Sequence, residues 1–312
     1  MSRHDLVLPA PPAHAGGVDS AHAGASPDGG SLSVVDFGGD GPDVVLVHSL
    51  GYCALHWQPL AQELTKRFHT YAVDLRGHGR STAELTSHEQ PWLDLIHLTE
   101  KLNLKRPLVV ANEFGSYYGA IAAIEHPQMF RGMVSIGALV ARPRAALEEM
   151  RDFALSDSMR DILIERFAFG VTVTGRAAAE AICDRIASDA HDDWLLRSIP
   201  QIRAEYEWCL RELPDDQWQV TPTPEAVYAG FNIPLSDRYF PGDHLCQLVE
   251  IPVWMVVPDD GHDTDLFDTL TQMAAQAEHL HVLSLRSGQY PHCTDPAAVA
   301  EIVSEAINAT SG

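Results

Sequence analysis

Three short segments of the chain carry side chains that can transfer protons or act as nucleophiles. Glu113 stands between an apolar run, Leu108–Ala111, and a helical pattern, Gly115–Glu125. The other two segments contain acids, histidines and a thiol, namely Asp260, His262 and Asp263 in one and His292 and Cys293 in the other. Carboxyl and imidazole groups serve in general acid–base catalysis, and carboxylates and thiolates serve as nucleophiles. The acidic run around His262 lacks a fixed ligand spacing, so we expect a solvated loop there and no metal site.

The charge of the chain excludes two classes of partner. Its 312 residues include 21 Lys+Arg against 43 Asp+Glu, which gives a net charge of −22. Such a chain is repelled by phosphate backbones and by anionic lipid, so we expect neither a nucleic-acid nor a membrane partner. The five cysteines are far apart and form no C-x-x-C pair, which is typical of reduced thiols. Asp5 and a proline cluster interrupt any signal-peptide core, so we expect a cytoplasmic protein.

The elements that must position the reactive residues alternate between strand and helix. Short apolar runs rich in β-branched residues are typical of strands buried in a parallel sheet. We expect strands at Ser31–Phe37, Val44–His48, Tyr71–Asp74, Leu108–Ala111, Gly132–Ile136, Val253–Val257 and Leu280–Leu283. Helical spacing predicts helices at His56–Arg67, Trp92–Leu104, Gly115–Glu125, Asp265–Gln276 and Pro296–Ile307. The alternation predicts an α/β fold, a mostly parallel sheet with helices on both faces.

The chain divides into a tail, a core and an insertion. Residues 1–30 are rich in Ala, Gly, Pro, His and Ser, a composition that predicts a disordered N-terminal tail. Residues 31–140 and 247–312 carry the strand–helix alternation of the core. Residues 141–246 are mostly helical and rich in aromatic residues, without a buried-strand run, so we expect a helical cap. Some cap aromatics are expected to line a pocket for a bulky or apolar small molecule, with Trp194, Trp208, Tyr228 and Phe231 as candidates.

Four motifs make residues 31–310 similar to the α/β-hydrolase fold family. The sequence His48-Ser49-Leu50-Gly51 resembles the family's oxyanion loop, and Asp74 to Ser81 resembles its D-x-R-G-x-G-x-S turn. Leu108 to Pro127 has the pattern of the strand, nucleophile elbow and following helix. Tyr290-Pro291-His292 resembles the segment at the catalytic histidine. The resemblance implies an α/β-hydrolase-like core with an inserted cap.

The catalytic positions depart from the family pattern. The elbow motif G-x-S-x-G reads Ala111-Asn112-Glu113-Phe114-Gly115, so a glutamate occupies the nucleophile position. The family's catalytic histidine is replaced by Gln289, and His292 corresponds to the second histidine of that pattern. Asp260 and Asp263 are the candidates for the acid after the strand Val253–Val257. The usual serine hydrolase triad is therefore absent.

This replacement favours general acid–base catalysis by Glu113, with Gln289 orienting Glu113 or the substrate through hydrogen bonds. Related epoxide hydrolases and haloalkane dehalogenases use an aspartate nucleophile and a histidine-activated water. Gln289 cannot accept a proton at neutral pH, so nucleophilic attack by Glu113 is the weaker interpretation. Isomerisation, dehydration, C–C cleavage or epoxide opening without a cofactor fits better, as a step in a biosynthetic or degradative pathway. The residues expected to form the oxyanion site or contact substrate are His48, Ser49, Leu50, Phe114 and His292.

Three alternatives remain at this point. Glu113 lies at a helix N-terminus, where backbone N–H groups stabilise an anion, and its carboxylate can fold into the vacated oxyanion hole. The chain can also be a non-catalytic small-molecule binder or structural homologue. A hydrolase with a relocated base, His292 or His262, is the third. No pattern in the sequence indicates the substrate or the oligomeric state.

Overall fold

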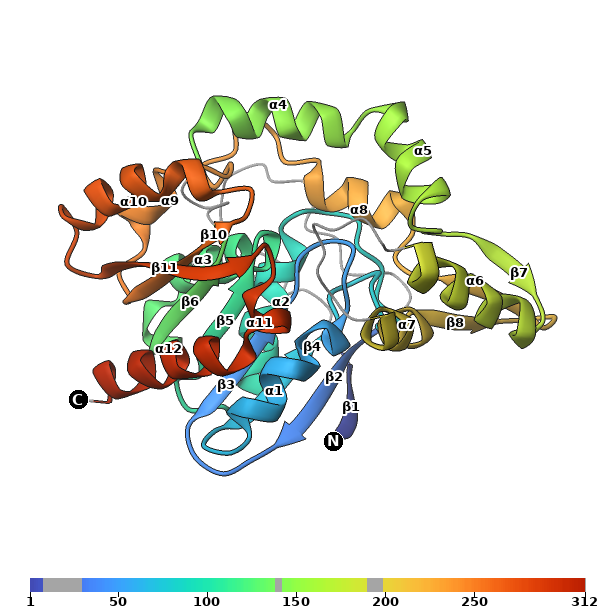
Figure 1. Ribbon diagram of the computed structural model, residues 1–312, viewed down its shortest axis with the longest axis horizontal. Coiled ribbons are helices and arrows are strands. Elements are labelled where there is room, and N and C mark those ends of the chain that lie inside the picture. Colours follow the sequence, from blue (N-terminus) through green and yellow to red (C-terminus); the bar gives the residue numbers. More distant parts are fainter. Residues whose placement is uncertain (8–29, 138–141, 190–198, 312) are drawn as a thin grey trace, which may run out of the picture.

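Eight strands form one sheet in the order β1-β2-β4-β3-β5-β6-β10-β11 (Figure 1). The computed structural model describes residues 1–7, 30–137, 142–189 and 199–311. The pairings β1–β2 and β2–β4 are antiparallel, and the other five are parallel. The strands are β1 (Ser2–Val7), β2 (Ser31–Gly38), β3 (Asp43–Val47), β4 (His69–Val73), β5 (Leu108–Asn112), β6 (Gly132–Ile136), β10 (Val253–Asp260) and β11 (Leu280–Gly288). The predicted mostly parallel sheet is confirmed.

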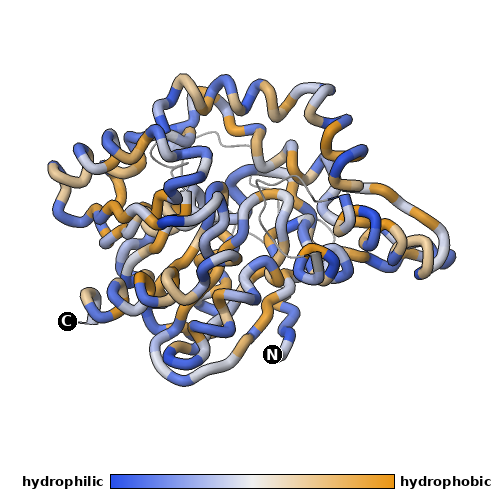
Figure 2. Tube along the Cα trace, viewed as in Figure 1, coloured by the Kyte–Doolittle hydropathy of each residue, from blue (hydrophilic) through white to orange (hydrophobic). Residues whose placement is uncertain are grey.

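Helices cover both faces of this sheet because alternate strand residues point to opposite faces. In β3, Val45 and Val47 belong to the apolar cluster on the face covered by α2 and α3, whereas Val44 and Leu46 belong to the cluster under α1 and α12. Figure 2 shows hydrophobic strands in the interior and hydrophilic stretches on the outer helices. The core helices are α1 (Gln58–Leu64), α2 (Gln90–Lys101), α3 (Phe114–Glu125), α10 (Phe267–Ala274), α11 (Pro291–Thr294) and α12 (Pro296–Ala309), with short 3-10 helices at η1 (Ala54–Trp57), η2 (Pro127–Met129) and η4 (Thr264–Leu266).

The insertion between β6 and β10 is helical but also contains a small sheet. Its helices are α4 (Arg144–Ala154), α5 (Asp157–Glu165), α6 (Arg176–Asp189), α7 (Ile199–Trp208), α8 (Pro224–Phe231) and α9 (Leu245–Leu248). A three-stranded antiparallel sheet, β7-β9-β8, joins them; its strands are β7 (Thr172–Thr174), β8 (Leu210–Leu213) and β9 (Gln217–Val220). The sequence did not predict these strands because each has three or four residues and most of their side chains are at least partly exposed.

The N-terminal residues differ from the prediction of a disordered tail over 1–30. Ser2–Val7 form the edge strand β1, which pairs with β2 from Ser2 opposite Asp36 to Val7 opposite Ser31. Leu6 packs against the large apolar cluster. Composition alone missed this strand because its pairing rests on backbone hydrogen bonds to an available sheet edge. The rest of the tail, residues 8–29, lies outside the described residues.

The connection from β5 to α3 is a sharp turn that fixes the position of Glu113. Glu113 has φ 44° and ψ −113°, a backbone conformation that a residue with a side chain rarely adopts. Gly115 lets the start of α3 approach β3, because a Cβ atom there would lie 2.2 Å from the carbonyl oxygen of Val47. Turns that follow parallel strands lie at the carboxyl edge of the sheet. The cap covers this edge, so Glu113 faces the cap.

One buried carboxylate joins the core to the cap. Asp74, at the end of β4, accepts hydrogen bonds from the backbone N–H groups of Ala54 (2.7 Å) and Arg80 (3.1 Å) and from the indole N–H of Trp208 in α7 (2.8 Å). The Arg80 guanidinium lies over the Trp208 ring, 3.8 Å from its centroid. The turn that contains Asp74 therefore anchors the cap as well as shaping the core.

We predict that Asp74→Ala lowers the free energy of unfolding by about 3 kcal/mol, because it leaves two buried donors and one part-buried donor unpaired. Trp208→Phe removes only one of these donors, so its cost should be about 1 kcal/mol. Urea unfolding of both variants measures the difference. A smaller loss for Asp74→Ala than for Trp208→Phe would contradict the role assigned to Asp74.

Candidate active site

A mostly apolar cavity of about 280 Å³ lies between the carboxyl edge of the sheet and the cap. Glu113 lies at one part of its wall, and a second carboxyl, Glu205 of α7, lies at another. Among the described residues that line it there is no lysine, arginine or histidine. They are Leu50, Gly51, Tyr52, Cys53, Glu113, Met159, Leu163, Phe167, Phe169, Glu205, Tyr206, Cys209, Thr221, Val227, Phe231 and Tyr290.

The Glu113 carboxyl accepts a hydrogen bond from Gln289, the pairing that the sequence predicts. Gln289 Nε2 lies 3.1 Å from Glu113 Oε1. Burial raises the pKa of Glu113, and the negative charge of Asp263 adds to the rise, while hydrogen bonds from Gln289 and Ser49 oppose it. Desolvation disfavours the charged form of a carboxyl group. Glu113 is therefore a group that holds its proton more strongly than a solvated glutamic acid.

The orientation of the Gln289 amide is fixed from its other end. The backbone N–H of His262 donates to Gln289 Oε1 at 2.7 Å, so the amide must present its N–H side to Glu113. Gln289 is buried, with 5% of its surface exposed. The amide thus bridges the elbow and the loop after β10, but it offers Glu113 a donor and no proton acceptor.

The two predicted acids differ in their surroundings. Asp263 is buried, and its carboxylate forms an ion pair with Arg142, whose guanidinium also donates to the carbonyl oxygen of His262 at 2.7 Å. A Cβ atom on Gly137 would contact both Asp263 and Glu113, which places the two carboxyl groups near each other. Asp260 is exposed at the end of β10. Asp263 therefore acts on Glu113 through its charge, whereas Asp260 points to solvent.

Two of the backbone N–H groups expected to form an oxyanion hole, those of Phe114 and Ser49, are engaged within the protein. The N–H of Phe114 donates to Ser49 Oγ (3.3 Å), and the N–H of Ser49 donates to Asn112 Oδ1 (3.1 Å). His48 is buried and shapes the loop, with Nδ1 2.7 Å from the Ser49 carbonyl oxygen and Nε2 accepting from the N–H of Leu75 (3.0 Å). The Leu50 side chain lines the cavity. The Ser49 hydroxyl thus stands where the elbow would hold an oxyanion.

His292 is not a cavity residue in the described structure. It is fully buried behind the wall, with Nε2 2.8 Å from Nε2 of His56. His56 Nδ1 lies 3.4 Å from Glu205 Oε1 and 3.9 Å from Cys293 Sγ. The sequence predicts that His292 contacts substrate. In the structure its ring contacts His56 instead. No sequence motif indicates His56 or Glu205 as site residues, because only the folded structure brings η1, α7 and α11 together.

The histidine–thiol cluster behind the cavity contains groups that bind transition metals. The ligand atoms of His56, His292 and Cys293 lie within 4.8 Å of one another. The two ring nitrogens of His56 already have hydrogen-bond partners, Glu205 on one side and His292 on the other. The geometry is that of a hydrogen-bonded network, and a metal would have to break it.

The cap aromatics divide into cavity and structural residues. The Phe231 ring lines the cavity and lies 4.5 Å from the Phe114 ring, measured between centroids. Trp208 instead binds Asp74, and the Tyr228 hydroxyl donates to the Ser156 carbonyl oxygen at 2.7 Å. Trp194 lies outside the described residues.

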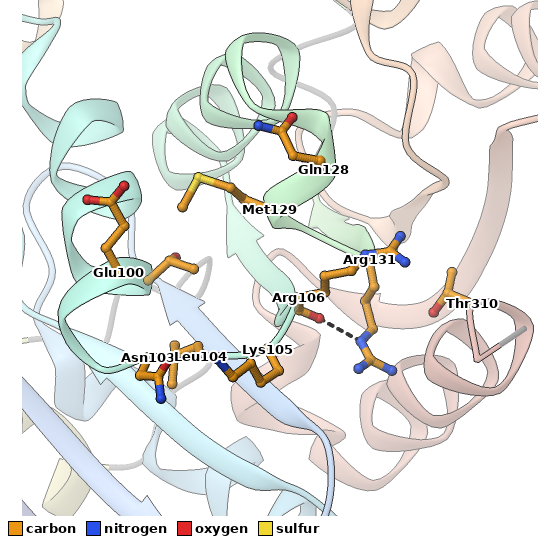
Figure 3. A pocket seen from close by; sticks show the side chains of 10 residues that line it. Glu100, Asn103, Leu104, Lys105, Arg106, Gln128, Met129, Arg131 and Thr310 are labelled. Atoms are coloured by element: carbon orange, nitrogen blue, oxygen red, sulfur yellow. Dashed lines mark hydrogen bonds between the residues drawn. The ribbon is translucent and has the colours of Figure 1, made fainter.

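A separate hollow lies at the opposite, amino-terminal edge of the sheet (Figure 3). Lys105 and Arg106 precede β5 and Arg131 precedes β6, and Arg131 Nε donates to the Arg106 carbonyl oxygen at 2.8 Å. Its lining combines these cations with one carboxyl group (Glu100), amides, hydroxyls and two apolar side chains, Leu104 and Met129. It holds no histidine, cysteine or pair of carboxyl groups among the described lining, so the acid–base site lies at the other edge.

The chain matches known proteins in its sequence. A model of the alpha/beta hydrolase family matches residues 44–302. The (E)-2-((N-methylformamido)methylene)succinate hydrolase of Acinetobacter baylyi is 27% identical over 161 residues, which are 50% of this chain and 58% of that protein. The 2-(acetamidomethylene)succinate hydrolase of Mesorhizobium japonicum is 31% identical over 100 residues, 31% of this chain and 36% of that protein. The matched stretches span less than two thirds of either relative.

Solved structures share the fold. The crystal structure of an E-2-(acetamidomethylene)succinate hydrolase has a TM-score of 0.67 at 20% identity, covering 89% of this chain and 96% of that one. A thioesterase domain from the curacin biosynthetic pathway has a TM-score of 0.66 at 15% identity, covering 98% of this chain and all of that one (100%). In the described part of the chain, no helix has the length and apolar character needed to span a membrane.

We predict that Glu113→Gln stabilises the protein at neutral pH by about 1 kcal/mol, or about 2 °C in Tm. The raised pKa of Glu113 means that its proton stabilises the fold, and this stability is lost as pH rises through the folded pKa. The difference between variant and wild type should therefore shrink as pH falls towards 4.5, the ordinary value for glutamic acid. Thermal melts across this pH range measure it, with Glu305→Gln on the exposed face of α12 as the control. A lower Tm for Glu113→Gln would contradict the prediction.

His56 should also make stability depend on pH. Burial opposes its charge, but electrostatic interactions and hydrogen bonds with Cys293 and Glu205 outweigh this and raise the pKa of His56 from 6.5 to about 9. The stabilisation is complete below pH 6.5 and is lost as pH rises through about 9. We expect wild type to lose up to about 3 kcal/mol more than His56→Gln over this range in urea unfolding. Equal losses in the two proteins would show that His56 is neutral.

Proposed function

Because the chain belongs to the alpha/beta hydrolase family, we propose that it is an enzyme that works without a cofactor and uses Glu113 as a general acid or base. The observation that carries the proposal is the Glu113 carboxyl itself, which borders an apolar cavity and has a pKa raised by burial. A carboxyl group in such surroundings holds its proton more strongly than a solvated one and can exchange it with a bound substrate. The reaction classes supported are isomerisation, dehydration, C–C cleavage and epoxide opening.

The environment of Glu113 argues against a covalent ester mechanism. An ester on Glu113 would need a base to activate water, and the residue at the histidine position, Gln289, directs an N–H group towards Glu113. The elbow N–H of Phe114 is already paired with Ser49 Oγ, so it does not offer a preformed oxyanion donor. Both features favour proton transfer over acyl transfer.

The cavity supports a neutral, largely apolar substrate. Its described lining has two carboxyl groups and no cationic side chain to pair with a substrate carboxylate. The names of the Acinetobacter and Mesorhizobium relatives denote substituted succinates, which carry carboxylates. We therefore propose that this chain acts on a different class of small molecule from these relatives.

A second candidate function is ligand binding without chemistry. The engaged donors at Ser49 and Phe114 support it, because they fill the position where other family sites hold reacting atoms. A ligand at 100 times its Kd would stabilise the fold by about 2.7 kcal/mol. Recovery of that ligand unchanged after long incubation distinguishes a binder from an enzyme.

We predict that a panel of neutral apolar epoxides, lactones and hydroxyketones contains compounds that the protein converts, whereas dicarboxylates are neither bound nor converted. Mass spectrometry of the incubated mixtures detects the products. For any converted compound, Glu113→Gln should lower kcat at least about 100-fold, and Glu305→Gln should leave it unchanged. Full turnover by Glu113→Gln would remove Glu113 from the mechanism. Incorporation of oxygen from labelled water would instead indicate a hydrolase with a relocated base.

A further inference from the structure

A second carboxyl group, that of Glu205, borders the same cavity as Glu113 but comes from the cap. Glu205 lies in α7, and 4% of its surface is exposed. Glu113 lies on the elbow of the core, so the closed cap brings two carboxyl groups to one cavity. Family motifs do not indicate Glu205, because it belongs to the inserted segment.

Glu205 is surrounded by groups that favour its ionised form. His56 Nδ1 lies 3.4 Å from its Oε1, and Gln201 Nε2 donates to the same oxygen at 3.1 Å. A carboxylate is an acceptor, and Nε2 of His56 shares a hydrogen bond with Nε2 of His292, which is the acceptor when His292 carries its proton on Nδ1. An imidazolium, which donates from both nitrogens, satisfies both contacts. The raised pKa of His56 agrees with this charge state.

The other titratable groups around this network include two thiols and two phenols, and the Tyr52 and Tyr290 rings lie 4.3 Å and 5.5 Å from the His56 ring between centroids. Cys293 Sγ lies 3.9 Å from His56 Nδ1 and accepts from Gln201 Nε2 at 3.3 Å. Cys53 Sγ faces the carbonyl oxygen of Glu205 at 3.8 Å. Nδ1 of His56 therefore faces both Glu205 and the Cys293 sulfur, and the Cys293 thiol donates to the His56 carbonyl oxygen at 3.5 Å.

The two cavity carboxyl groups have opposite environments. Glu113 receives a neutral amide donor from Gln289 and lies near the negative charge of Asp263, so its protonated form is favoured. Glu205 is also buried, but it faces His56, whose raised pKa favours a positive charge beside this carboxyl group. When the surroundings of two carboxyl groups push their pKa values apart, the group with the higher pKa is assigned as the acid and the other as the base.

We propose that Glu205 is the second catalytic residue and takes a proton from the substrate while Glu113 donates one, with His56 as a positioning residue. In a dehydration, the C–H electron pair becomes the new C=C bond and the proton passes to Glu205. The C–O pair leaves with the oxygen, which takes the proton of Glu113 and departs as water. Exchange with solvent then returns a proton to Glu113 and removes one from Glu205. This inference rests on the proposed function and adds the base to it.

The charge assignment can be measured without a substrate. In protein labelled with ¹³C at the glutamate carboxyl carbons, NMR signals of Glu113 and Glu205 are assigned with Glu113→Gln and Glu205→Gln. We expect the Glu113 signal to change at higher pH than the Glu205 signal. A Glu205 signal that changes together with Glu113, or at higher pH, would overturn the proposal.

Turnover of a compound found with the panel tests the role itself. Glu205→Gln should lower kcat at least about 100-fold, and Glu207→Gln on the same helix should not. In D₂O, Glu113→Gln should still exchange the substrate C–H proton, whereas Glu205→Gln should not. If Glu113→Gln is inactive but Glu205→Gln retains turnover, the inference fails and the proposed function stands. If both variants retain turnover, the proposed function fails.

A milder variant keeps the test valid if Glu205→Gln does not fold. Gln201→Met removes one donor from Glu205 and leaves His56 in place. Because this weakens the ionised form of Glu205, the acid limb of the kcat/KM profile should move to higher pH. An unchanged limb in the folded variant would contradict the assignment of Glu205 as the base.

Discussion

The proposed chemistry of the site depends on the burial of one carboxyl group, that of Glu113, away from water. The elbow at Glu113 holds the side chain at the carboxyl edge of the sheet, in a backbone conformation that β5 and α3 impose from either side. The cap covers this edge with apolar side chains, and burial then raises the pKa of Glu113. In water the same group would be an ordinary surface acid. Its chemistry is therefore a consequence of where the fold places it and of what covers it.

The cap takes part in the site as well as covering it. Helix α7 contacts the core through polar groups spaced along it, with Glu205 beside His56 and Trp208 beside Asp74. Buried charges and donors of this kind are costly unless paired, so the seam has few alternative arrangements. The same contacts that hold the cap closed also present Glu205 to the cavity. The polar contacts of α7 with the core thus hold the cap in place and also position Glu205 for the proposed chemistry.

Local sequence patterns predict the core. The Glu113–Gln289 pair, whose members are 176 positions apart, is indicated by the resemblance to the hydrolase family and not by a local pattern. Buried β-branched runs predict the parallel strands, and the elbow motif places Glu113 between β5 and α3. The strand Ser2–Val7 and the small cap sheet depend on pairing with distant segments, which composition does not record. Glu205 and His56 are 149 positions apart, and their contact exists only in the folded chain. His292 was assigned to substrate from its motif, but its ring packs against His56 and Trp57.

The most direct test of this account is a neutron crystal structure that locates the proton on Glu113. Crystals should be held just above pH 4.5, where more than half of a solvated glutamic acid is ionised and a group with a raised pKa keeps more of its proton. The account predicts a deuterium atom on the Glu113 carboxyl, a carboxyl that faces the cavity, and a Gln289 amide that donates to it. An ionised Glu113 turned onto the backbone N–H of Phe114, with the cavity collapsed, would contradict it.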